Sequence, residues 1–403
     1  MSDWKQCLLG SIAEVQTGPF GSQLKNEQYI TGGTPVITVE HINAFRIQNI
    51  DYPSVTEDDR QRLARYSLNA GDIVFTRVGS VDLSAYVKPE NQGWLFSSRM
   101  LRVRVSTVEV DSLFLSYFFR QEKFREYILN IAVGATMPSI NTQILKDIPI
   151  SYPPLPEQKA IASVLSSLDD KIDLLHRQNK TLEAMAETLF RQWFIEEAKE
   201  DWEVTPLSRI FDFLEGPGIR NWQYVENGVN FINIRLIDVG EVNVNSANKI
   251  SEEEAFGKYK HFMLEEGDLI VSTSGTLGKS AIIRKYHLPL CLNTSVIRFR
   301  PKQDIYREFM YSYLKSRVFL EELETTASGS VQLNFGPTHL KKIDIRLPPT
   351  ELIMSYHTIT SEVFNKINSN FEQIQTLEKL RDTLLPKLMS GEVRVQFKQE
   401  SAA

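Results

Sequence analysis

The sequence contains an internal duplication: landmarks in its first half recur in the same order about 195 residues later. The matching landmarks are Asp3-Trp4 with Asp201-Trp202, Gly18-Pro19 with Gly216-Pro217, Gly71-Asp72 with Gly267-Asp268, Leu145-Lys146 with Leu340-Lys341, and Pro153-Pro154 with Pro348-Pro349. Two copies of one unit in a single chain predict a molecule with internal pseudo-two-fold symmetry. Such a molecule has two similar, separately diverged surfaces, which suits a partner that is itself nearly two-fold symmetric.

Length and composition limit the class of protein. A chain of 403 residues can form two or three domains that each bury a core. Its 42% hydrophobic and 24% charged residues are typical of a globular protein. The two cysteines, Cys7 and Cys291, exclude a disulfide framework and a cysteine-rich zinc site. Because no stretch of the sequence approaches the length of a membrane span, we expect a cytoplasmic protein.

The formal net charge of −6 argues at first sight against a nucleic-acid partner. Residues 1–154, however, carry 16 acidic and 15 basic side chains, and residues 201–349 carry 19 and 18. A domain with balanced charge can still gather its arginines on one face, so net charge does not decide the partner.

Each copy begins with a region of mixed secondary structure. Alternating hydrophobic residues predict strands at residues 35–39, 72–75 and 101–105, and at the corresponding residues 230–234, 268–271 and 296–299. A single helical stretch is expected from Asp111-Ser112, and its counterpart from Asp304. Each copy is therefore predicted to form an α+β domain with many irregular loops.

Each copy ends in a long helix with a hydrophobic seam. Between Pro156 and Pro206 the chain contains neither glycine nor proline, and nine of ten positions at 4-3 spacing are apolar. The second copy follows the spacing less purely, and both seams carry an asparagine, which fixes register at some cost in stability. The central seam positions are Leu168, Ile172, Leu175, Asn179 and Leu182, then Ile367, Asn370, Ile374 and Leu377.

The simplest partner for each helix is the other one. The predicted fold is α+β: two repeated globular domains, residues 1–154 and 201–349, are joined by two long helices, residues 155–200 and 350–395. The helices form an antiparallel coiled coil with pseudo-two-fold symmetry and hold the domains at its opposite ends, and residues 396–403 form a tail. A less specific alternative is that both are merely long core helices. The seam contains Arg381, which could reach solvent or meet an acidic partner.

The chain resembles the DNA specificity subunits of type I restriction–modification systems, the HsdS-like proteins, over nearly its whole length. The resemblance rests on Pro153–Gln158 and Leu189–Phe194 as the start and end of a conserved helix, Leu384–Val393 as a closing motif, the paired Gly-Asp strands at 71 and 267, and Gly134-Ala135-Thr136. One departure is the start of the second helix, where residues 348–352 read PPTEL and lack the Glu-Gln pair.

The resemblance implies a sequence-specific DNA-binding subunit without chemistry of its own. Two target-recognition domains would each bind one half of a split DNA sequence, with the helices setting the gap. Two DNA-methyltransferase subunits would dock on the helices and methylate adenine N6, and restriction/translocase subunits would add cleavage. No cofactor is expected in this chain, whereas S-adenosylmethionine, ATP and Mg²⁺ would belong to the partner subunits. The six histidines show no metal-ligand spacing, so no metal is expected either.

Direct DNA recognition needs Arg, Lys, Asn, Gln and hydroxyl side chains on exposed loops. The candidates are Lys25, Asn43, Arg46, Arg77, Ser98, Arg99, Thr136 and Asn141 in the first copy, and Arg220, Asn233, Arg235, Ser274, Lys279, Asn293, Thr294, Gln332 and Asn334 in the second. Each could instead be a solvated or turn-capping residue. Because Arg77 aligns with Thr273 and Ser98 with Thr294, the two copies should recognise different sequences, which predicts an asymmetric target.

Two other classes of function stay open. A scaffold could use the coiled coil to space two protein-binding domains without touching DNA. An enzyme could bind nucleotide at Thr273–Ser280, which follows a predicted strand but has Thr273 at the first glycine position of a phosphate-binding loop. The corresponding loop, Thr76–Asp82, has no such character, so we favour contact of Lys279 and the loop amides with DNA phosphate.

Overall fold

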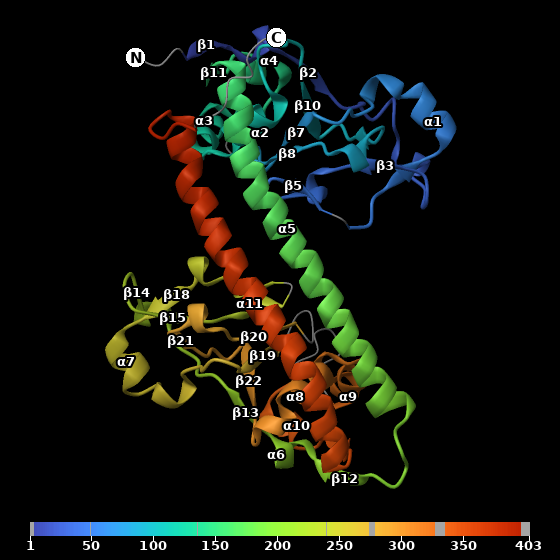
Figure 1. The fold of residues 1–403 in the computed structure, drawn as a ribbon, viewed down its shortest axis with the longest axis vertical. Helices are drawn as coiled ribbons and strands as arrows, with labels where there is room; N and C mark the ends of the chain where they lie inside the picture. Colours follow the sequence, from blue (N-terminus) through green and yellow to red (C-terminus); the bar gives the residue numbers. More distant parts are fainter. Residues whose placement is uncertain are drawn as a thin grey trace, which may run out of the picture. The chain divides into compact units, whose positions relative to one another are not determined.

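The structure is a computed structural model that describes residues 4–48, 50–134, 136–238, 240–273, 279–326 and 335–395. The chain divides into two compact units (Figure 1). Unit 1 comprises Met1–Ile172 together with Thr376–Ala403, and unit 2 comprises Asp173–Gln375. Each unit therefore contains one copy of the repeat and a segment of each long helix.

Unit 1 is built on a four-stranded antiparallel sheet of order β2-β10-β7-β8. Its strands are β2 (Ala13–Thr17), β10 (Met100–Val105), β7 (Ile73–Thr76) and β8 (Ser84–Tyr86). The smaller elements are the sheet β6 (Ser54–Val55), β3 (Thr34–Ile37) and β9 (Leu95–Phe96), the hairpin β4 (Ile42–Asn43) and β5 (Arg46–Ile47), and the pair β1 (Lys5–Leu8) and β11 (Pro149–Tyr152). The short helices are α1 (Glu57–Arg62), α2 (Ser112–Arg120), α3 (Glu122–Ile131) and α4 (Thr142–Lys146).

Unit 2 repeats this plan. Its main sheet has the order β13-β22-β19-β20, with β13 (Phe211–Glu215), β22 (Val296–Pro301), β19 (Leu269–Ser272) and β20 (Ser280–Ile282). The smaller elements are the sheet β14 (Tyr224–Val225), β18 (Asn248–Ile250), β15 (Val229–Phe231) and β21 (Leu290–Cys291), the hairpin β16 (Ile237–Asp238) and β17 (Glu241–Val242), and the pair β12 (Glu203–Pro206) and β23 (Asp344–Leu347). The short helices are α6 (Leu207–Ile210), α7 (Glu252–Phe256), α8 (Arg307–Lys315), α9 (Arg317–Thr326) and α10 (Pro337–Leu340).

The two long helices are α5 (Leu155–Arg191) and α11 (Thr350–Met389). In unit 1, Ile161 and Leu165 of α5 share a hydrophobic core with Leu385 and Leu388 of α11. In unit 2, Asn370 of α11 donates to Asn179 of α5. Further along α5, Ala186 O accepts from Tyr356, which lies earlier in α11. The helix segments within each unit are therefore antiparallel, as the sequence predicts.

The predicted strands and helices are largely confirmed, with one correction. The predicted strands at 72–75, 101–105, 268–271 and 296–299 correspond to β7, β10, β19 and β22, whereas β3 ends at Ile37 and β15 at Phe231. The expected single helix after Asp111 is instead two helices, because the backbone of Gln121 is extended (φ −61°, ψ 139°) and ends α2. Ser316 breaks α8 from α9 in the same way. Asp111 does cap α2, since its Oδ1 accepts from the Phe114 amide at 2.8 Å.

Candidate nucleic-acid interface

Loops that are far apart in sequence come together at one end of the strands of the main sheet in unit 1, where β2 and β7 end and β10 begins. The amide of Gly18 donates to Met100 O at 3.3 Å, and the amide of Arg77 donates to Arg99 O at 2.8 Å. Ile140 in turn donates its amide to Arg77 O at 2.9 Å. We call this set of loops, residues 18–20, 77–80, 97–99, 133–134 and 136–141, the loop edge of unit 1. Among the candidates it brings together are Arg77, Ser98, Arg99, Thr136 and Asn141.

The same edge is assembled in unit 2. The amide of Thr273 donates to Ser295 O at 3.1 Å, as Arg77 does to Arg99, and the amide of Phe335 donates to Thr273 O at 3.2 Å. Residues 216–218, 273, 293–295 and 335–337 form the loop edge of unit 2. Asn293 and Thr294 lie here, while Ser274, Gln332 and Asn334 lie outside the described residues.

A glycine lets the first loop approach the sheet at both edges. A Cβ atom added to Gly18 would lie 2.1 Å from Ser97 O, and one added to Gly216 would lie 2.5 Å from Asn293 N. Any other residue would force these loops apart. The Gly-Pro landmark of the sequence therefore marks the same close contact in both units.

Buried ion pairs support both sheets, and sequence reasoning missed them. Arg104 on β10 bonds Asp72 with 2.7 Å contacts, and Arg300 on β22 bonds the equivalent Asp268 at 2.6 and 2.9 Å. These hydrogen bonds raise the pKa of both arginines. The repeated Arg-x-Arg pattern in the two strands, set against the Gly-Asp landmarks, was the signal that could have predicted these pairs.

The arginine at the loop edge of unit 1 is held in place rather than free in solvent. The Arg77 guanidinium is half-buried, lies 5.8 Å from the centroid of the Phe20 ring, and donates to Ser98 O at 3.4 Å. Phe20 is itself 54% exposed. Arg99 and Thr136 are exposed as well. Asn141 accepts from the Ile144 amide at 2.9 Å and therefore caps α4.

The remaining candidates of unit 1 lie in its smaller elements. Lys25 is exposed at the start of a one-turn helix, Asn26–Gln28. Asn43 is exposed on the β4–β5 hairpin. Arg46, on the same hairpin, is 3.5 Å from Asp169 of α5 and so forms part of an internal ion pair.

In unit 2, several of the predicted DNA-contacting residues form hydrogen bonds within the protein. Asn233 accepts from the Arg235 amide at 2.9 Å and caps a short turn, while the Arg235 side chain is exposed. Lys279 Nζ donates to Ile237 O at 2.8 Å rather than pointing to solvent. The strand β20 follows Lys279 directly, so the strand–loop–helix order of a phosphate-binding loop is not formed here.

The seam residues lie along the helix pairs of both units. Ile172, Leu175, Asn179, Ile367, Asn370 and Ile374 are buried, and Leu168, Leu182 and Leu377 are half-buried. The two asparagines contact each other directly: Asn370 Nδ2 donates to Asn179 Oδ1 at 2.8 Å. A buried amide pair of this kind disfavours shifted registers, because a shift would leave both amides against apolar side chains.

Arg381, whose role the sequence left open, meets an acidic partner. Its Nη1 donates to Asp169 Oδ1 at 3.0 Å, and Asp169 also accepts from Tyr117 at 2.7 Å and Arg120 at 2.5 Å. Burial alone would raise the pKa of Asp169, but Arg120 and the other donors lower it to about 2. This network joins α2, α5 and α11 within unit 1.

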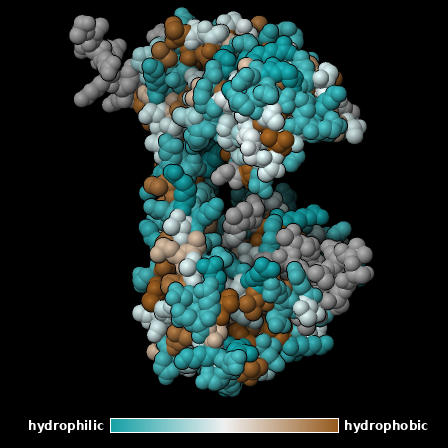
Figure 2. Space-filling model, turned by 90° about the vertical axis from the view of Figure 1, so that its right-hand side faces the viewer, coloured by the Kyte–Doolittle hydropathy of each residue, from teal (hydrophilic) through white to brown (hydrophobic). Residues whose placement is uncertain are grey.

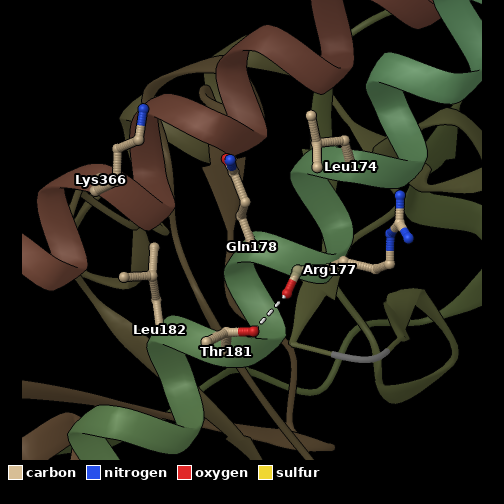
Figure 3. Close-up of a pocket in the computed structure, with 6 residues that line it drawn as sticks. All are labelled: Leu174, Arg177, Gln178, Thr181, Leu182 and Lys366. Carbon is tan, nitrogen blue, oxygen red and sulfur yellow. Dashed lines mark hydrogen bonds between the residues drawn. The ribbon is translucent and has the colours of Figure 1, made fainter.

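A shallow pocket of about 540 Å³ lies on the helix pair of unit 2. It is lined by Leu174, Arg177, Gln178, Thr181, Leu182 and Lys366. Figure 3 shows five of these side chains on α5 and Lys366 on α11. Leu174 is 39% exposed at this pocket. Figure 2 shows one face of the molecule, which is mostly hydrophilic with scattered hydrophobic patches.

The described residues offer neither a metal site nor a membrane span. No group of three or more His, Cys, Asp or Glu side chains there could hold a metal ion. Within the same ranges, none of the helices combines the length and hydropathy needed to cross a bilayer.

A duplicated α+β unit with two loop edges of different composition is the architecture expected of a two-site recognition protein. The family described as "Type I restriction modification DNA specificity domain" matches residues 1–184 and 199–379. The chain therefore belongs to the family of type I restriction–modification specificity subunits, and its two units are DNA-recognition domains of that family.

Two relatives and one solved structure agree with this assignment. The type I restriction enzyme MjaIX specificity subunit of Methanocaldococcus jannaschii is 28% identical over 420 residues, covering 98% of this chain and 94% of that protein. The HindI specificity subunit of Haemophilus influenzae is 22% identical and covers 98% and 100%. The crystal structure of a type I restriction–modification S subunit from M. genitalium shares the fold, with a TM-score of 0.58 and 18% identity over 96% of each chain.

Proposed function

We propose that this chain binds a split, asymmetric sequence in double-stranded DNA, with one half of the target read at each loop edge. The observation that carries the proposal is the pair of equivalent loop edges with different side chains. Arg77 and Arg99 in unit 1 are replaced by Thr273 and Ser295 in unit 2 on the same backbone frame. Arginine favours guanine and hydroxyl side chains are less selective, so the two half-sites should differ.

The chain is proposed to act as a guide for partner subunits rather than as a catalyst. In this proposal two methyltransferase subunits, which carry S-adenosylmethionine, methylate adenine N6 within the target. Restriction/translocase subunits would add ATP- and Mg²⁺-dependent cleavage. The exposed Leu174 at the pocket of unit 2 supports docking of a methyltransferase subunit on α5, because an apolar surface beside charged side chains is typical of protein interfaces.

Mapping N6-methyladenine across the genome of cells with and without this gene tests the proposal. We expect one bipartite motif to lose methylation when the gene is deleted, with two unlike half-sites separated by a fixed gap. Unchanged methylation, or loss at a continuous palindromic motif, would contradict the proposal.

Salt dependence separates DNA recognition from a scaffold function. The chain, copurified with its methyltransferase subunits, should lose duplex affinity steeply as salt rises, because phosphate contacts release counterions. A scaffold that binds only proteins would show no such duplex affinity at any salt concentration.

Leu174→Glu should reduce recovery of the methyltransferase subunits and leave the fold of the chain intact, because Leu174 is already partly exposed.

A further inference from the structure

A one-turn helix is repeated in the two units and held by the same glutamine. In unit 2 it is Asn221–Gln223, and Gln223 Oε1 accepts from the Arg220 amide at 3.0 Å. In unit 1 it is Asn26–Gln28, and Gln28 Oε1 accepts from the Lys25 amide at 2.9 Å. Both turns therefore begin with a basic residue whose own amide is bonded by the glutamine three positions later.

The same glutamine also ties each turn to the body of its unit. Gln223 Nε2 donates to Glu254 Oε1 at 2.8 Å, and Gln28 Nε2 donates to Asp59 Oδ1 at the same distance. Gln223 additionally donates to the Tyr259 hydroxyl at 3.2 Å. With both ends of the amide bonded, the backbone of the turn is held in place, and the neighbouring Cα–Cβ bonds point in set directions.

The middle residue of this turn is the one that differs most between the two units. It is Glu27 in unit 1 and Trp222 in unit 2. The Trp222 side chain is 80% exposed, whereas the other four tryptophans of the chain are buried or half-buried. Burial of a tryptophan side chain removes a large apolar area from water, and tryptophan is enriched among the residues that contribute most to binding energy at interfaces.

The turn continues directly from the loop edge. The segment that begins at Gly216 contacts the loop of Asn293 and Thr294, and a Cβ atom on Gly218 would lie 3.5 Å from Thr294 Cγ2. Arg220 and Trp222 follow within four residues, and Arg220 is exposed. An exposed cation two residues before an exposed aromatic side chain, on the segment that contacts the loop edge, suits a phosphate-bearing partner whose bases present apolar surface.

We propose that Trp222 is a specificity-determining residue that contacts the bases of the half-site bound by unit 2, with Arg220 on the adjacent phosphate. This inference rests on the proposed function and adds a residue to it. The indole ring offers apolar contact, for which a thymine methyl group is the natural partner in the major groove. Glu27 at the equivalent position of unit 1 would instead accept a hydrogen bond from a cytosine amino group. One fixed turn thus carries a different recognition side chain in each half.

The experiment selects bound duplexes from a random DNA library, using the full chain copurified with its methyltransferase subunits. Wild type is compared with Trp222→Ala, Trp222→Glu and Arg220→Ala. Trp222→Ala should lose preference at one or two adjacent base pairs of a single half-site and weaken binding of the wild-type target about tenfold. Trp222→Glu should change the preferred base at those positions, while the other half-site stays unchanged in both variants.

Arg220→Ala is the matched control for a phosphate contact. It should weaken all sequences alike and lower the slope of log K against log salt by about one, without changing base preference. Because Trp222 is exposed, its variants should melt at the wild-type temperature. Trp222→Phe should retain most of the preference, which a purely structural role would not require.

Each outcome of the selection bears on a different claim. If wild type selects a bipartite sequence and Trp222→Ala selects the same sequence with equal affinity, the inference about Trp222 is overturned and the proposed function stands. If Trp222→Ala only reduces recovery of the methyltransferase subunits, Trp222 belongs to a protein interface and the inference is overturned as well. If wild type selects no sequence, the proposed function itself fails, and this inference falls with it.

Discussion

The two units attach their globular parts to the long helices by different chemistry. Both units pack apolar side chains against the helices, but unit 1 adds a buried polar network around Gln158 and Asp169. Unit 2 adds aromatic contacts around Phe309, together with one ion pair between His357 of α11 and Glu308 of α8. The order of strands and helices is the same in both units, whereas the side chains between the globular part and the long helices differ. This difference separates what the fold requires of the contact from what each copy could change. The fold requires a complementary buried surface, and polar and apolar side chains can both supply it.

In unit 1 the contact begins with Gln158, which is fully buried near the start of α5. Its Oε1 accepts from the Asp111 amide at 2.9 Å, and its Nε2 donates to Pro153 O at 2.8 Å and to Glu109 O at 2.9 Å. Three turns further along α5, Asp169 accepts from side chains of α2 and α11. Every one of these contacts depends on a partner at a definite position, because an unpaired buried polar group is costly.

In unit 2 the position of Gln158 is occupied by Ile353, which is also fully buried. The position of Asp169 is occupied by Phe364, whose ring centroid lies 5.2 Å from that of Tyr311. Phe309 of α8 completes the contact, because its ring centroid lies 5.5 Å from Phe190 and 5.0 Å from Phe194, near the end of α5. The absence of the Glu-Gln pair from the second helix start is therefore compensated by aromatic and aliphatic packing.

The largest effect is expected for Phe309→Ala, which removes the central ring of the aromatic contact. Phe309 is 2% exposed, and replacing a fully buried phenylalanine by alanine costs about 4 kcal/mol. Hydrogen exchange followed by mass spectrometry should show faster exchange across 307–326, with residues 112–131 of unit 1 unchanged. Phe309→Leu is the control and should cost about 1.5 kcal/mol, because it keeps most of the apolar volume. Equal loss of protection in both units would show that the two attachments are not independent.

The corresponding change in unit 1 is Asp169→Asn, which removes the negative charge shared by Arg120, Arg381 and Arg46. Breaking a buried pair from one side leaves cations without their partner, and we expect a loss of about 3 kcal/mol. Exchange should now increase across 112–131 and not across 307–326. A loss below about 0.5 kcal/mol would show that the network is exposed enough for water to replace the carboxylate.

The pH dependence of this variant gives a second test. The pKa of Asp169 in the folded chain, about 2, lies below its ordinary value, so its stabilising contribution is present above about pH 4 and is lost as the pH falls toward 2. The difference in unfolding free energy between wild type and Asp169→Asn should therefore shrink between pH 4 and pH 2. Urea unfolding curves at pH 6, 4 and 3 measure this difference. A difference that grows on acidification would contradict the assigned direction.

Much of this architecture could be predicted from the sequence, because duplication and heptad spacing are regular patterns. The long helices, their antiparallel pairing within each unit, and the strands β7 and β19 follow from periodicity and from the repeated Gly-Asp landmarks. The break at Gln121 could not be predicted, because glutamine is a good helix former. Ser316 does carry a signal that was missed: its hydroxyl accepts from the Phe319 amide at 3.3 Å and caps α9.

The candidate interface was harder to predict than the fold. Sequence reasoning could select residue types that bind DNA, but it could not tell which of them are used inside the protein. Arg46 pairs with Asp169, Lys279 bonds Ile237 O, and Asn141 caps a helix, whereas Arg99 and Thr294 are exposed at the two loop edges. Trp222 is not among the predicted candidates, and its 80% exposure is visible only in the folded structure.

A smaller effect is expected from exchanging the polar and aliphatic side chains at the starts of α5 and α11. Gln158→Leu keeps the volume but leaves the Asp111 amide and two carbonyl groups without their partner, for a loss of about 2 kcal/mol. Ile353→Gln places an amide in a site built for an aliphatic side chain and should cost a similar amount. Urea unfolding measures both. If Gln158→Leu were neutral, the polar attachment of unit 1 would not need its hydrogen bonds, and the contrast between the units would lose its physical basis.

The smallest effect separates ring packing from hydroxyl bonding in unit 2. The Tyr356 hydroxyl is within 2.8 Å of Ser312 Oγ and donates to Ala186 O at 3.2 Å, while its ring lies 5.0 Å from Phe194. If ring packing dominates, Tyr356→Phe should cost no more than about 1 kcal/mol. Tyr117→Phe in unit 1 is the matched control: it removes a hydrogen bond to a carboxylate and should cost about 2 kcal/mol. Both variants delete one hydroxyl group, and urea unfolding measures the loss of unfolding free energy in each. An equal loss would mean that the two attachments rely on hydrogen bonds to the same extent. A larger loss for Tyr356→Phe than for Tyr117→Phe would mean that the attachment of unit 2 relies on them more.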